Sequence, residues 1–466
     1  MSIRLTALAA VAIAATAAGG SSQGTSEALK AVGRSPLRVA TSVWRQGELI
    51  VAFRDGVDAH DVEAALRVGQ ARSARPSLFG KRYLVRLDEH ASLRDAVARF
   101  ARMSEVLYAE PNGIVHASQV QTFTPDDRVF RFQWNFRELN AERIWAIQKG
   151  QPSVAVAVLD TGIAYEDYTD PRTREVFRKA PDWGSTVFLP GYDFVNADAH
   201  PDDDSYHGTH VASTIAEATN NGIGAAGLAF GCALMPVKVL DANGAGTFFD
   251  VAEGIDYAVN YQDSSGKKPV KVINLSLGSD ISPSDPGYAQ TATVTAAVDR
   301  AVAAGILVVA AAGNAAKGVS DFPASLPNVV SVGAIDAREQ LASYSNFGPD
   351  LDLVAPGGDC QHDMDGDGAP DCIWQQMPDF EAVARGRHDE FCYCGLDGTS
   401  MATPHVSAAA ALLFSQGFTD PAAVRAALEQ TALRLGGAPQ GGRNDTYGHG
   451  LVQPAKALTG LGLDTQ

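Results

Sequence analysis

Five short apolar runs separated by helical segments restrict the fold of this chain more than any other feature. They lie at residues 154–159, 234–240, 270–277, 306–312 and 328–335. Each run is continuous rather than alternating, which is typical of parallel strands buried on both faces. Residues 249–262 and 291–304 have the apolar spacing of helices. The pattern predicts one α/β domain, with a doubly wound and mostly parallel sheet, over about residues 130–466.

A smaller α+β unit is predicted ahead of this domain, at residues 38–117. Strands and helices alternate along it, with strands expected at 48–53, 82–87 and 106–109 and helices at 59–68 and 91–102. Residues 27–116 carry 14 basic and 11 acidic side chains, whereas residues 117–466 carry 22 and 43. The opposite charges indicate that the two parts dock on each other. A basic domain with a separate partner of its own would fit the same counts.

The first 20 residues have the pattern of a secretory signal peptide. Arg4 supplies a positive charge, residues 5–18 are mostly small and apolar, and residues 15–17 offer an Ala-x-Ala cleavage pattern. A buried N-terminal helix is the alternative interpretation. The stretch is short for a bilayer, and no other segment of the sequence is apolar enough for one. We therefore expect an exported monomer without a membrane span, and the net charge of −17 argues against a nucleic-acid partner.

Three polar segments follow a predicted strand or open a predicted helix. Asp160 follows the first strand of the larger domain, His207 opens one helix, and Ser400 opens another. A serine hydroxyl needs an adjacent base to act as a nucleophile, and that base needs a carboxylate to fix its tautomer. At a helix start, Ser400 is near the positive end of the helix dipole. Pro404 is expected in the first turn of this helix, where proline is tolerated.

A fourth polar residue, Asn314, follows another predicted strand. Beside the backbone N–H of Ser400, its amide has the chemistry to donate to the oxyanion of a tetrahedral intermediate. His210 and His405, in the same helical segments, are interpreted as packed structural histidines. Each segment alone is a weak signal. Together, the order Asp, His, Asn, Ser at strand and helix ends is a strong one.

These four residues resemble the catalytic residues of the subtilisin-family serine endopeptidases, or subtilases, in which the triad has the order Asp, His, Ser. The resemblance covers about residues 133–458 and includes segments 272–278, 344–348, 355–357 and 447–452. It implies that Ser400 is the nucleophile and His207 the general base and then acid. It also implies that Asp160 orients His207 and that Asn314 helps to form the oxyanion hole.

The unit at residues 38–117 resembles the inhibitor-like propeptide of the same family, which is ferredoxin-like. The resemblance implies that this unit assists folding, blocks the substrate cleft as an intramolecular inhibitor, and is then removed by the enzyme itself.

The resemblance also assigns residues to the S1 pocket for the substrate. Its two walls would be formed by Ser276, Leu277 and Gly278 and by Ala311, Ala312 and Gly313. These walls are small and apolar, which favours broad specificity. Asp321 falls near the family position at the bottom of the pocket, and we hypothesise from it a preference for Lys or Arg at P1.

Residues 358–396 form an insert that is longer than the family usually has. Carboxylates on alternate positions followed by glycine resemble an extracellular calcium loop, and they comprise Asp363, Asp365, Asp367 and Asp371. The closing Glu of an EF-hand is missing from this stretch, and a solvated acidic loop is the alternative. The family resemblance implies a second calcium site, with the Asn221 side chain, the carbonyls of Thr219, Ile223 and Ala225, and the Gln133 side chain as ligands.

Four of the five cysteines lie in this insert: Cys360, Cys372, Cys392 and Cys394. In an exported chain, two disulfides are the favoured interpretation. The pairing is not determined, although the short spacing counts against Cys392–Cys394. A zinc site that combines these thiols with His362 or His388 is the rival. Cys232 is interpreted as a small buried apolar residue.

The sequence therefore predicts a secreted, calcium-stabilised serine endopeptidase that hydrolyses peptide bonds in proteins through an acyl-enzyme and matures by removing its own propeptide. Two alternatives remain. One is a catalytically silent binding or adhesion module organised around the calcium insert. The other is a peptide ligase, which usually needs a Cys nucleophile where this chain has Ser400.

Overall fold

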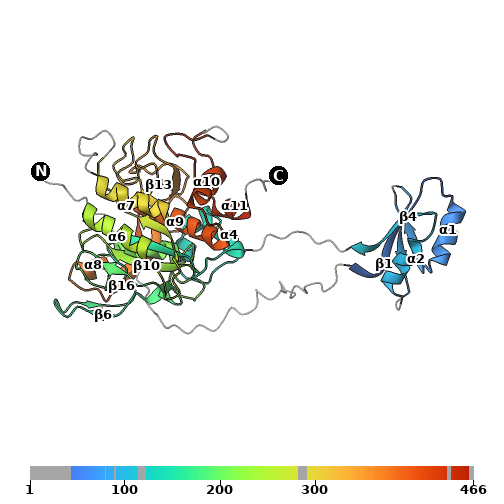
Figure 1. Cartoon of the computed structure of the whole chain (residues 1–466), viewed down its shortest axis with the longest axis horizontal. Coiled ribbons are helices and arrows are strands. Elements are labelled where there is room, and N and C mark those ends of the chain that lie inside the picture. Colours follow the sequence, from blue (N-terminus) through green and yellow to red (C-terminus); the bar gives the residue numbers. More distant parts are fainter. Residues whose placement is uncertain are drawn as a thin grey trace. The chain divides into compact units, whose positions relative to one another are not determined.

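The computed structural model describes residues 44–78, 80–88, 91–113, 122–281, 291–437 and 442–460 of the 466-residue chain. The chain divides into two compact units, one within Ala17–Gln119 and one within Val120–Gln466 (Figure 1). The predicted signal peptide at residues 1–20 lies outside the described residues. Across the described ranges, no helix is both long enough and apolar enough to cross a membrane.

The N-terminal unit has the ferredoxin-like order of strands and helices. Its elements are β1 (Trp44–Phe53), α1 (Ala59–Val68), β2 (Ser73–Pro76), β3 (Arg82–Arg86), α2 (Leu93–Phe100) and β4 (Val106–Gly113). The strands form an antiparallel sheet in the order β2-β3-β1-β4. Strand β2 was not predicted from the sequence, because this short strand is polar and mostly exposed. It lies at the sheet edge, where alternation of apolar residues is not required.

The larger unit is built on a parallel sheet in the order β14-β13-β12-β11-β5-β10-β8, with β9 also paired to β10. Its strands are β5 (Ala155–Asp160), β8 (Val187–Phe188), β9 (Tyr192–Asp193), β10 (Ala233–Lys238), β11 (Val270–Leu275), β12 (Leu307–Ala311), β13 (Val329–Ile335) and β14 (Leu353–Pro356). All residues of β5, β10, β12 and β13 are buried, as the continuous apolar runs require. The predicted doubly wound α/β fold is confirmed.

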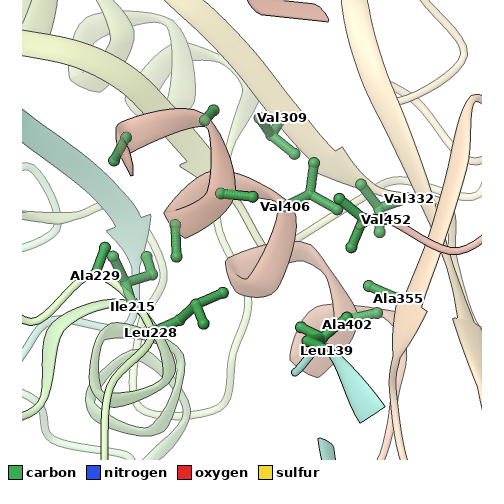
Figure 2. Close-up of a cluster of buried hydrophobic side chains, with 14 of the residues drawn as sticks. Leu139, Ile215, Leu228, Ala229, Val309, Val332, Ala355, Ala402, Val406 and Val452 are labelled. Atoms are coloured by element: carbon green, nitrogen blue, oxygen red, sulfur yellow. The ribbon is translucent and has the colours of Figure 1, made fainter. Parts of the chain in front are cut away.

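Helices cover both faces of this sheet. Alternate residues of β5 enter two separate cores: Val156 and Val158 pack with α5 (His207–Ala216) and α9 (Thr399–Gln416), whereas Ala157 packs with α6 (Phe248–Asn260) and α7 (Ala292–Ala303). Figure 2 shows the first core around α9, with Val406 close to Val309 of β12. The other helices are α3 (Trp134–Glu138), α4 (Ala141–Ile147), α10 (Pro421–Thr431) and α11 (Pro454–Thr459), with 3-10 turns at Phe130–Phe132 and Pro181–Trp183.

The strand order reverses its direction at β5. The chain leaves β5 for β10 on one side and later adds β11 on the other side. In an open α/β sheet, ligands bind beyond the carboxyl ends of the strands at such a reversal. Asp160 is the last residue of β5 and lies at this point.

The insert forms a β-hairpin of β15 (Ile373–Pro378) and β16 (Phe391–Leu396), with α8 (Phe380–Val383) in its connection. A second small hairpin pairs β6 (Tyr168–Thr169) with β7 (Val176–Phe177). The cysteines of the insert form two disulfides, Cys360–Cys372 and Cys392–Cys394.

The expectation against Cys392–Cys394 is therefore wrong. Alternate residues of a strand point to the same face, and the Cα atoms of Cys392 and Cys394 in β16 are 5.4 Å apart, a distance that a disulfide can span. Because these four thiols are paired, they are not available to the zinc site considered as the rival. Cys232 is a free, buried cysteine, as predicted.

The prediction for Pro404 is also wrong in its position. Helix α9 begins at Thr399, so Pro404 lies in the second turn rather than the first. Proline has no N–H to donate to the carbonyl four residues earlier, which is that of Ser400. The hydroxyl of Ser276 donates to this carbonyl oxygen instead, at 2.9 Å.

Candidate active site

The sheet and two helices bring Asp160, His207 and Ser400 to one region of the larger unit. Asp160 ends β5, His207 begins α5, and Ser400 is the second residue of α9. The His207 Nδ1 atom lies 2.7 Å from the Asp160 Oδ1 atom. Asp160 is fully buried and also accepts a hydrogen bond from the Thr161 N–H at 2.8 Å. The carboxylate is thereby shielded from water and held in place against the imidazole ring.

Gly208 allows α5 to begin this close to β5. A Cβ atom at this position would lie 2.1 Å from the carbonyl oxygen of Gly162 and 3.1 Å from the Cβ atom of Asp160. The first of these distances is shorter than any real contact, and the neighbour is backbone. A larger residue would therefore push His207 away from Asp160.

Asp203 connects the end of β5 to the start of α5. Its carboxylate accepts hydrogen bonds from the Thr161 hydroxyl at 2.9 Å and from the Thr209 N–H at 2.9 Å. Asp203 is buried, and burial raises its pKa to about 6 although these hydrogen bonds oppose the rise. It satisfies a helix N-terminal N–H in the way that a capping residue does. Asp203 was not predicted as a site residue, and its signal in the sequence was an Asp shortly before a predicted helix.

The pKa of His207 is raised above its ordinary value. Burial acts to lower it, but the charge and hydrogen bond of Asp160, together with the charge of Asp203, outweigh burial. The site therefore stabilises the imidazolium form of His207, which a general base becomes after it accepts a proton.

Ser400 is hydrogen-bonded to Ser276, and its neighbour in the chain, Thr399, is hydrogen-bonded to Asn314. The Ser400 hydroxyl donates to the Ser276 carbonyl oxygen at 3.0 Å. The Asn314 Oδ1 atom accepts hydrogen bonds from the N–H and the hydroxyl of Thr399, at 2.8 and 3.0 Å. Because Thr399 holds the oxygen of this amide, the NH₂ group of the exposed Asn314 side chain is its remaining donor.

A cleft of about 740 Å³ runs past His207 and Ser400. Ser276, Leu277 and Gly278 line it, in the segment directly after β11, which ends at Leu275 rather than at the predicted residue 277. Two further walls were not predicted from the sequence. One is the glycine-rich loop of residues 242–247, and the other is a group of apolar side chains, Leu240, Phe248, Val251, Val294 and Phe322. The cleft therefore offers extended contact to a chain-like ligand with apolar side chains.

The second predicted wall of the S1 pocket lies behind Asp321. Ala311 and Ala312 are buried, and the Asp321 N–H donates to the Ala312 carbonyl oxygen at 2.8 Å. A Cβ atom at Gly278 would lie 3.2 Å from the Asp321 Cβ atom, and one at Gly313 would lie 2.3 Å from its Oδ2 atom. Asp321 thus lies close to both predicted walls, but neither it nor residues 311–313 are among the residues that line the cleft. Burial raises the pKa of Asp321, and the charge of a nearby lysine opposes the rise.

His210 and His405 have the structural roles that were predicted. The His210 Nε2 atom lies 2.8 Å from the Ile373 carbonyl oxygen, and the His405 ring contacts Asn135 and the Met401 carbonyl oxygen. Both rings are buried, and burial lowers their pKa values to about 3 and about 4. They stay neutral and hold the backbone.

The acidic loop of the insert brings together three of its four predicted ligands. Oxygen atoms of Asp363, Asp365 and Asp371 lie within 4.8 Å of one another. Burial, and then the charges of the neighbouring aspartates, raise the pKa of Asp371 to about 6. Asp367 instead lies 3.6 Å from Arg137, which also pairs with Asp365. Three convergent carboxylates, one of them buried, fit a hard cation such as Ca²⁺.

The second predicted calcium position differs from the expected one in its ligands. Gln133 binds backbone there, since its Oε1 atom accepts from the Ala226 N–H at 2.9 Å and its Nε2 atom donates to the Trp374 carbonyl oxygen at 3.1 Å. Its side chain is thus occupied in holding these two segments together.

Two carboxylates that the sequence analysis missed lie beside Asn221 instead. The Asn221 amide donates to Asp182 at 2.6 Å, and Asp127 accepts from the Asn221 N–H at 3.3 Å. Burial raises the pKa of Asp127 and brings that of Asp182 to about 6. The predicted carbonyl ligands Thr219, Ile223 and Ala225 belong to the same loop, and the Ala225 N–H bonds Asp182. Two buried carboxylates beside the carbonyl groups of a partly exposed loop offer oxygen ligands of the kind that calcium prefers.

Comparisons with known proteins agree with this geometry. The Subtilase family (Peptidase_S8) matches residues 151–450, and the Fervidolysin N-terminal prodomain matches residues 38–112. The thermophilic serine proteinase of Bacillus sp. (strain AK1) is 36% identical over 84% of this chain and 83% of its own length. An extracellular protease of Xanthomonas campestris pv. campestris is 32% identical over 88% of this chain and 72% of its own length.

A solved structure is similar too. This structure, of proteases from Pseudoalteromonas arctica PAMC 21717, is 30% identical to this protein with a TM-score of 0.59. The match covers 72% of this chain and 99% of the solved chain. Because the family match includes Asp160, His207 and Ser400 and spans well over half of the chain, this protein belongs to the subtilase family and is a subtilisin-like serine protease with an N-terminal prodomain.

Proposed function

We propose that this protein is a secreted endopeptidase that cleaves peptide bonds through an acyl-enzyme on Ser400 and matures by removing its own prodomain. The observation that carries the proposal is the 2.7 Å contact between His207 and the buried Asp160, beside a cleft that Ser400 also lines. A base fixed by a carboxylate next to a helix-start serine is the arrangement that nucleophilic acyl transfer needs.

In the proposed reaction, the Ser400 hydroxyl leaves the Ser276 carbonyl and gives its proton to His207 as its oxygen attacks the scissile carbonyl carbon. The Asn314 amide and the Ser400 N–H donate to the oxyanion that forms, at the positive end of α9. His207 then gives the proton to the leaving amine, and the peptide N-terminal to the cut stays on Ser400 as an ester. Water, deprotonated by His207, hydrolyses this ester and restores the free hydroxyl.

For the substrate, we propose that Leu277 and Gly278 contact the P1 side chain and that Asp321 favours Lys or Arg there. The support is the place of Asp321, whose Cβ atom lies close to Gly278 and whose carboxyl group lies close to Gly313. A half-buried carboxylate binds a cationic group more strongly than an exposed one, because fewer water molecules compete.

For calcium, we propose two structural sites. One would use Asp363, Asp365 and Asp371, and the other would use Asp127, Asp182 and the Asn221 side chain, with carbonyl oxygens of residues 219–225. Bound calcium would neutralise carboxylates that the fold forces together, and would thereby stabilise the folded state.

For the domain organisation, we propose a signal peptide at residues 1–20, the prodomain at 38–117 and the peptidase domain at 130–466 with the insert at 358–396. The charge contrast between the basic prodomain region and the acidic remainder supports an intramolecular inhibitor that is steered to the cleft. The signal-like start of the sequence and the relative described as an extracellular protease support export.

The test is to express the full-length wild type and Ser400→Ala with calcium present, and to measure intact mass and casein hydrolysis. We expect the wild type to lose its first hundred or so residues and to digest casein, while the variant stays full length and inactive. If neither chain were processed and neither cut casein or a peptide library, the binding-module alternative would replace this proposal. Processing of both chains would assign maturation to another protease.

A further inference from the structure

A second group of metal-binding side chains lies near the triad but outside it. Ligand atoms of Glu166, His200 and Asp202 all lie within 4.8 Å of one another. Glu166 belongs to the loop that follows β5, whereas His200 and Asp202 belong to the loop ahead of α5. These are the two segments that continue from Asp160 and lead to His207.

Asp202 is the unusual member of this group. It is only 3% exposed, and within the described structure neither of its carboxylate oxygens has a hydrogen-bond partner. A buried carboxylate without partners is unfavourable unless a cation compensates it. The charged side chains that line the adjoining pocket are mostly acidic, with Arg172 among them.

His200 is held in position to contribute a ring nitrogen. Its Nδ1 atom lies 2.9 Å from the Glu166 Oε1 atom, and its ring stacks on Tyr168 with centroids 3.7 Å apart and planes 9° from parallel. The side chains of His200 and Glu166 are 37% and 30% exposed. A pocket of about 340 Å³, lined in part by Tyr168, His200 and Asp202, adjoins them. An ion from solvent can therefore reach the group.

We propose that Glu166, His200 and Asp202 bind a zinc ion. An imidazole nitrogen together with carboxylates is a ligand set that suits Zn²⁺, whereas Ca²⁺ and Mg²⁺ prefer oxygen ligands alone. Two ligands that are each about 2.1 Å from one tetrahedral zinc ion lie roughly 3.4 Å apart. The His200 Nδ1 and Glu166 Oε1 atoms, at 2.9 Å, would therefore separate by about half an ångström to bind the ion.

The zinc ion would link the two segments that deliver the triad residues. Asp202 directly precedes Asp203, and Asp203 accepts hydrogen bonds from Thr161, at the start of the first segment, and from Thr209, in the first turn of α5. The ion would also neutralise the two carboxylates at this site. Its role is therefore structural, and its removal would be seen first in thermal stability and metal content.

The experiment uses full-length Ser400→Ala protein, so that self-cleavage does not interfere, after metals are removed with a chelator. Zinc is titrated by calorimetry, and the unfolding temperature is measured with and without zinc. His200→Ala and Glu166→Gln are compared with the parent. The control is His60→Ala, in the exposed Asp58, His60 and Asp61 group of the prodomain, where the carboxylate of Asp58 already caps α1.

We expect the parent and His60→Ala to bind one more zinc equivalent than His200→Ala and Glu166→Gln, and to gain thermal stability that these two variants do not gain. Circular dichroism checks that each variant is folded, and if His200→Ala does not fold, the partly exposed Glu166→Gln decides. Unchanged zinc binding in the folded variants would overturn the proposal. It would also be overturned if equimolar calcium displaced zinc, because the site would then be an oxygen-ligand calcium site.

Discussion

Ser276 and Ser400 exchange two hydrogen bonds. The Ser276 hydroxyl donates to the Ser400 carbonyl oxygen at 2.9 Å, and the Ser400 hydroxyl donates to the Ser276 carbonyl oxygen at 3.0 Å. The first bond replaces the helical bond that Pro404 cannot make. The proline thus leaves a carbonyl free in α9, and a residue of the substrate cleft binds it. The position of the proposed nucleophile is in this way tied to a wall of the cleft.

We expect Ser276→Ala to destabilise the protein by about 1–3 kcal/mol, because the Ser400 carbonyl would lose its hydroxyl donor. Adding Pro404→Ala should recover part of this loss, since an alanine at this position would supply the missing helical N–H. Urea unfolding in the Ser400→Ala background, which prevents autolysis, measures both changes. Ser279→Ala, in the same cleft, serves as the control. A double variant no more stable than Ser276→Ala would show that Pro404 and Ser276 are not coupled.

The raised pKa of His207 predicts a pH dependence of activity. Protonated His207 cannot accept the Ser400 proton, so kcat/KM should rise with pH and reach half its maximum above about 6.5, the ordinary histidine value. Asp160→Asn removes the charge that outweighs burial, and it should lower kcat by about 10⁴-fold. A peptide substrate assayed from pH 5 to 10 tests the profile, with His449→Gln as the control. A midpoint below 6 would contradict the prediction.

The raised pKa of His207 also predicts that folding stability falls with rising pH, whereas activity rises. A histidine with a raised folded-state pKa stabilises the fold fully below its unfolded pKa and loses this contribution as pH rises through the folded pKa. The contribution of the His207–Asp160 pair should therefore decline from about pH 6.5 upward. The unfolding temperatures of Ser400→Ala and of the Ser400→Ala, His207→Gln double variant should therefore converge as the pH rises. A gap that widens with pH would show that the sign is wrong.

Asp321 predicts selectivity at P1. A charge-assisted hydrogen bond contributes about 1.5–3 kcal/mol, so Asp321→Ala should lower kcat/KM for a substrate with Arg at P1 by about ten- to a hundredfold. Hydrolysis of the matching Phe substrate should change little. Glu253→Gln controls for general electrostatic effects, because Glu253 is an exposed acid of the same unit. A wild-type enzyme that clearly prefers Phe at P1 would contradict the proposed preference for Lys or Arg.

Calcium removal tests the acidic loop. Asp371→Asn removes a buried carboxylate of the Asp363, Asp365 and Asp371 group, so we expect one calcium equivalent to be lost in calorimetric titration. At a calcium concentration 100 times the Kd, the parent should gain about 2.7 kcal/mol of stability that the variant lacks. Asp389→Asn, which changes an exposed carboxylate of the same insert, is the matched control. Equal calcium binding by all three proteins would rule out this site.

The sequence by itself determined the parts of this protein that depend on local pattern. Continuous apolar runs predicted the buried parallel strands, because a strand covered on both faces must be apolar at every position. Asp160 and Asn314, which follow two of these runs, were identified as site candidates, and ligands of an α/β sheet bind beyond the carboxyl ends of its strands. The exposed edge strand Ser73–Pro76 escaped detection for the same reason, since it carries no such pattern.

Only the tertiary structure decided which distant residues become partners. Asp203 bonds Thr161 across 42 residues, and Asp182 meets Asn221 across 39, although nothing in the local sequence of either aspartate specifies these contacts. Side-chain hydrogen bonds and metal ligand sets depend on distances of a few tenths of an ångström between separate segments. Such distances depend on how the helices pack on the sheet, because packing determines where each loop begins and ends. Hydrophobic periodicity in the sequence does not encode these distances.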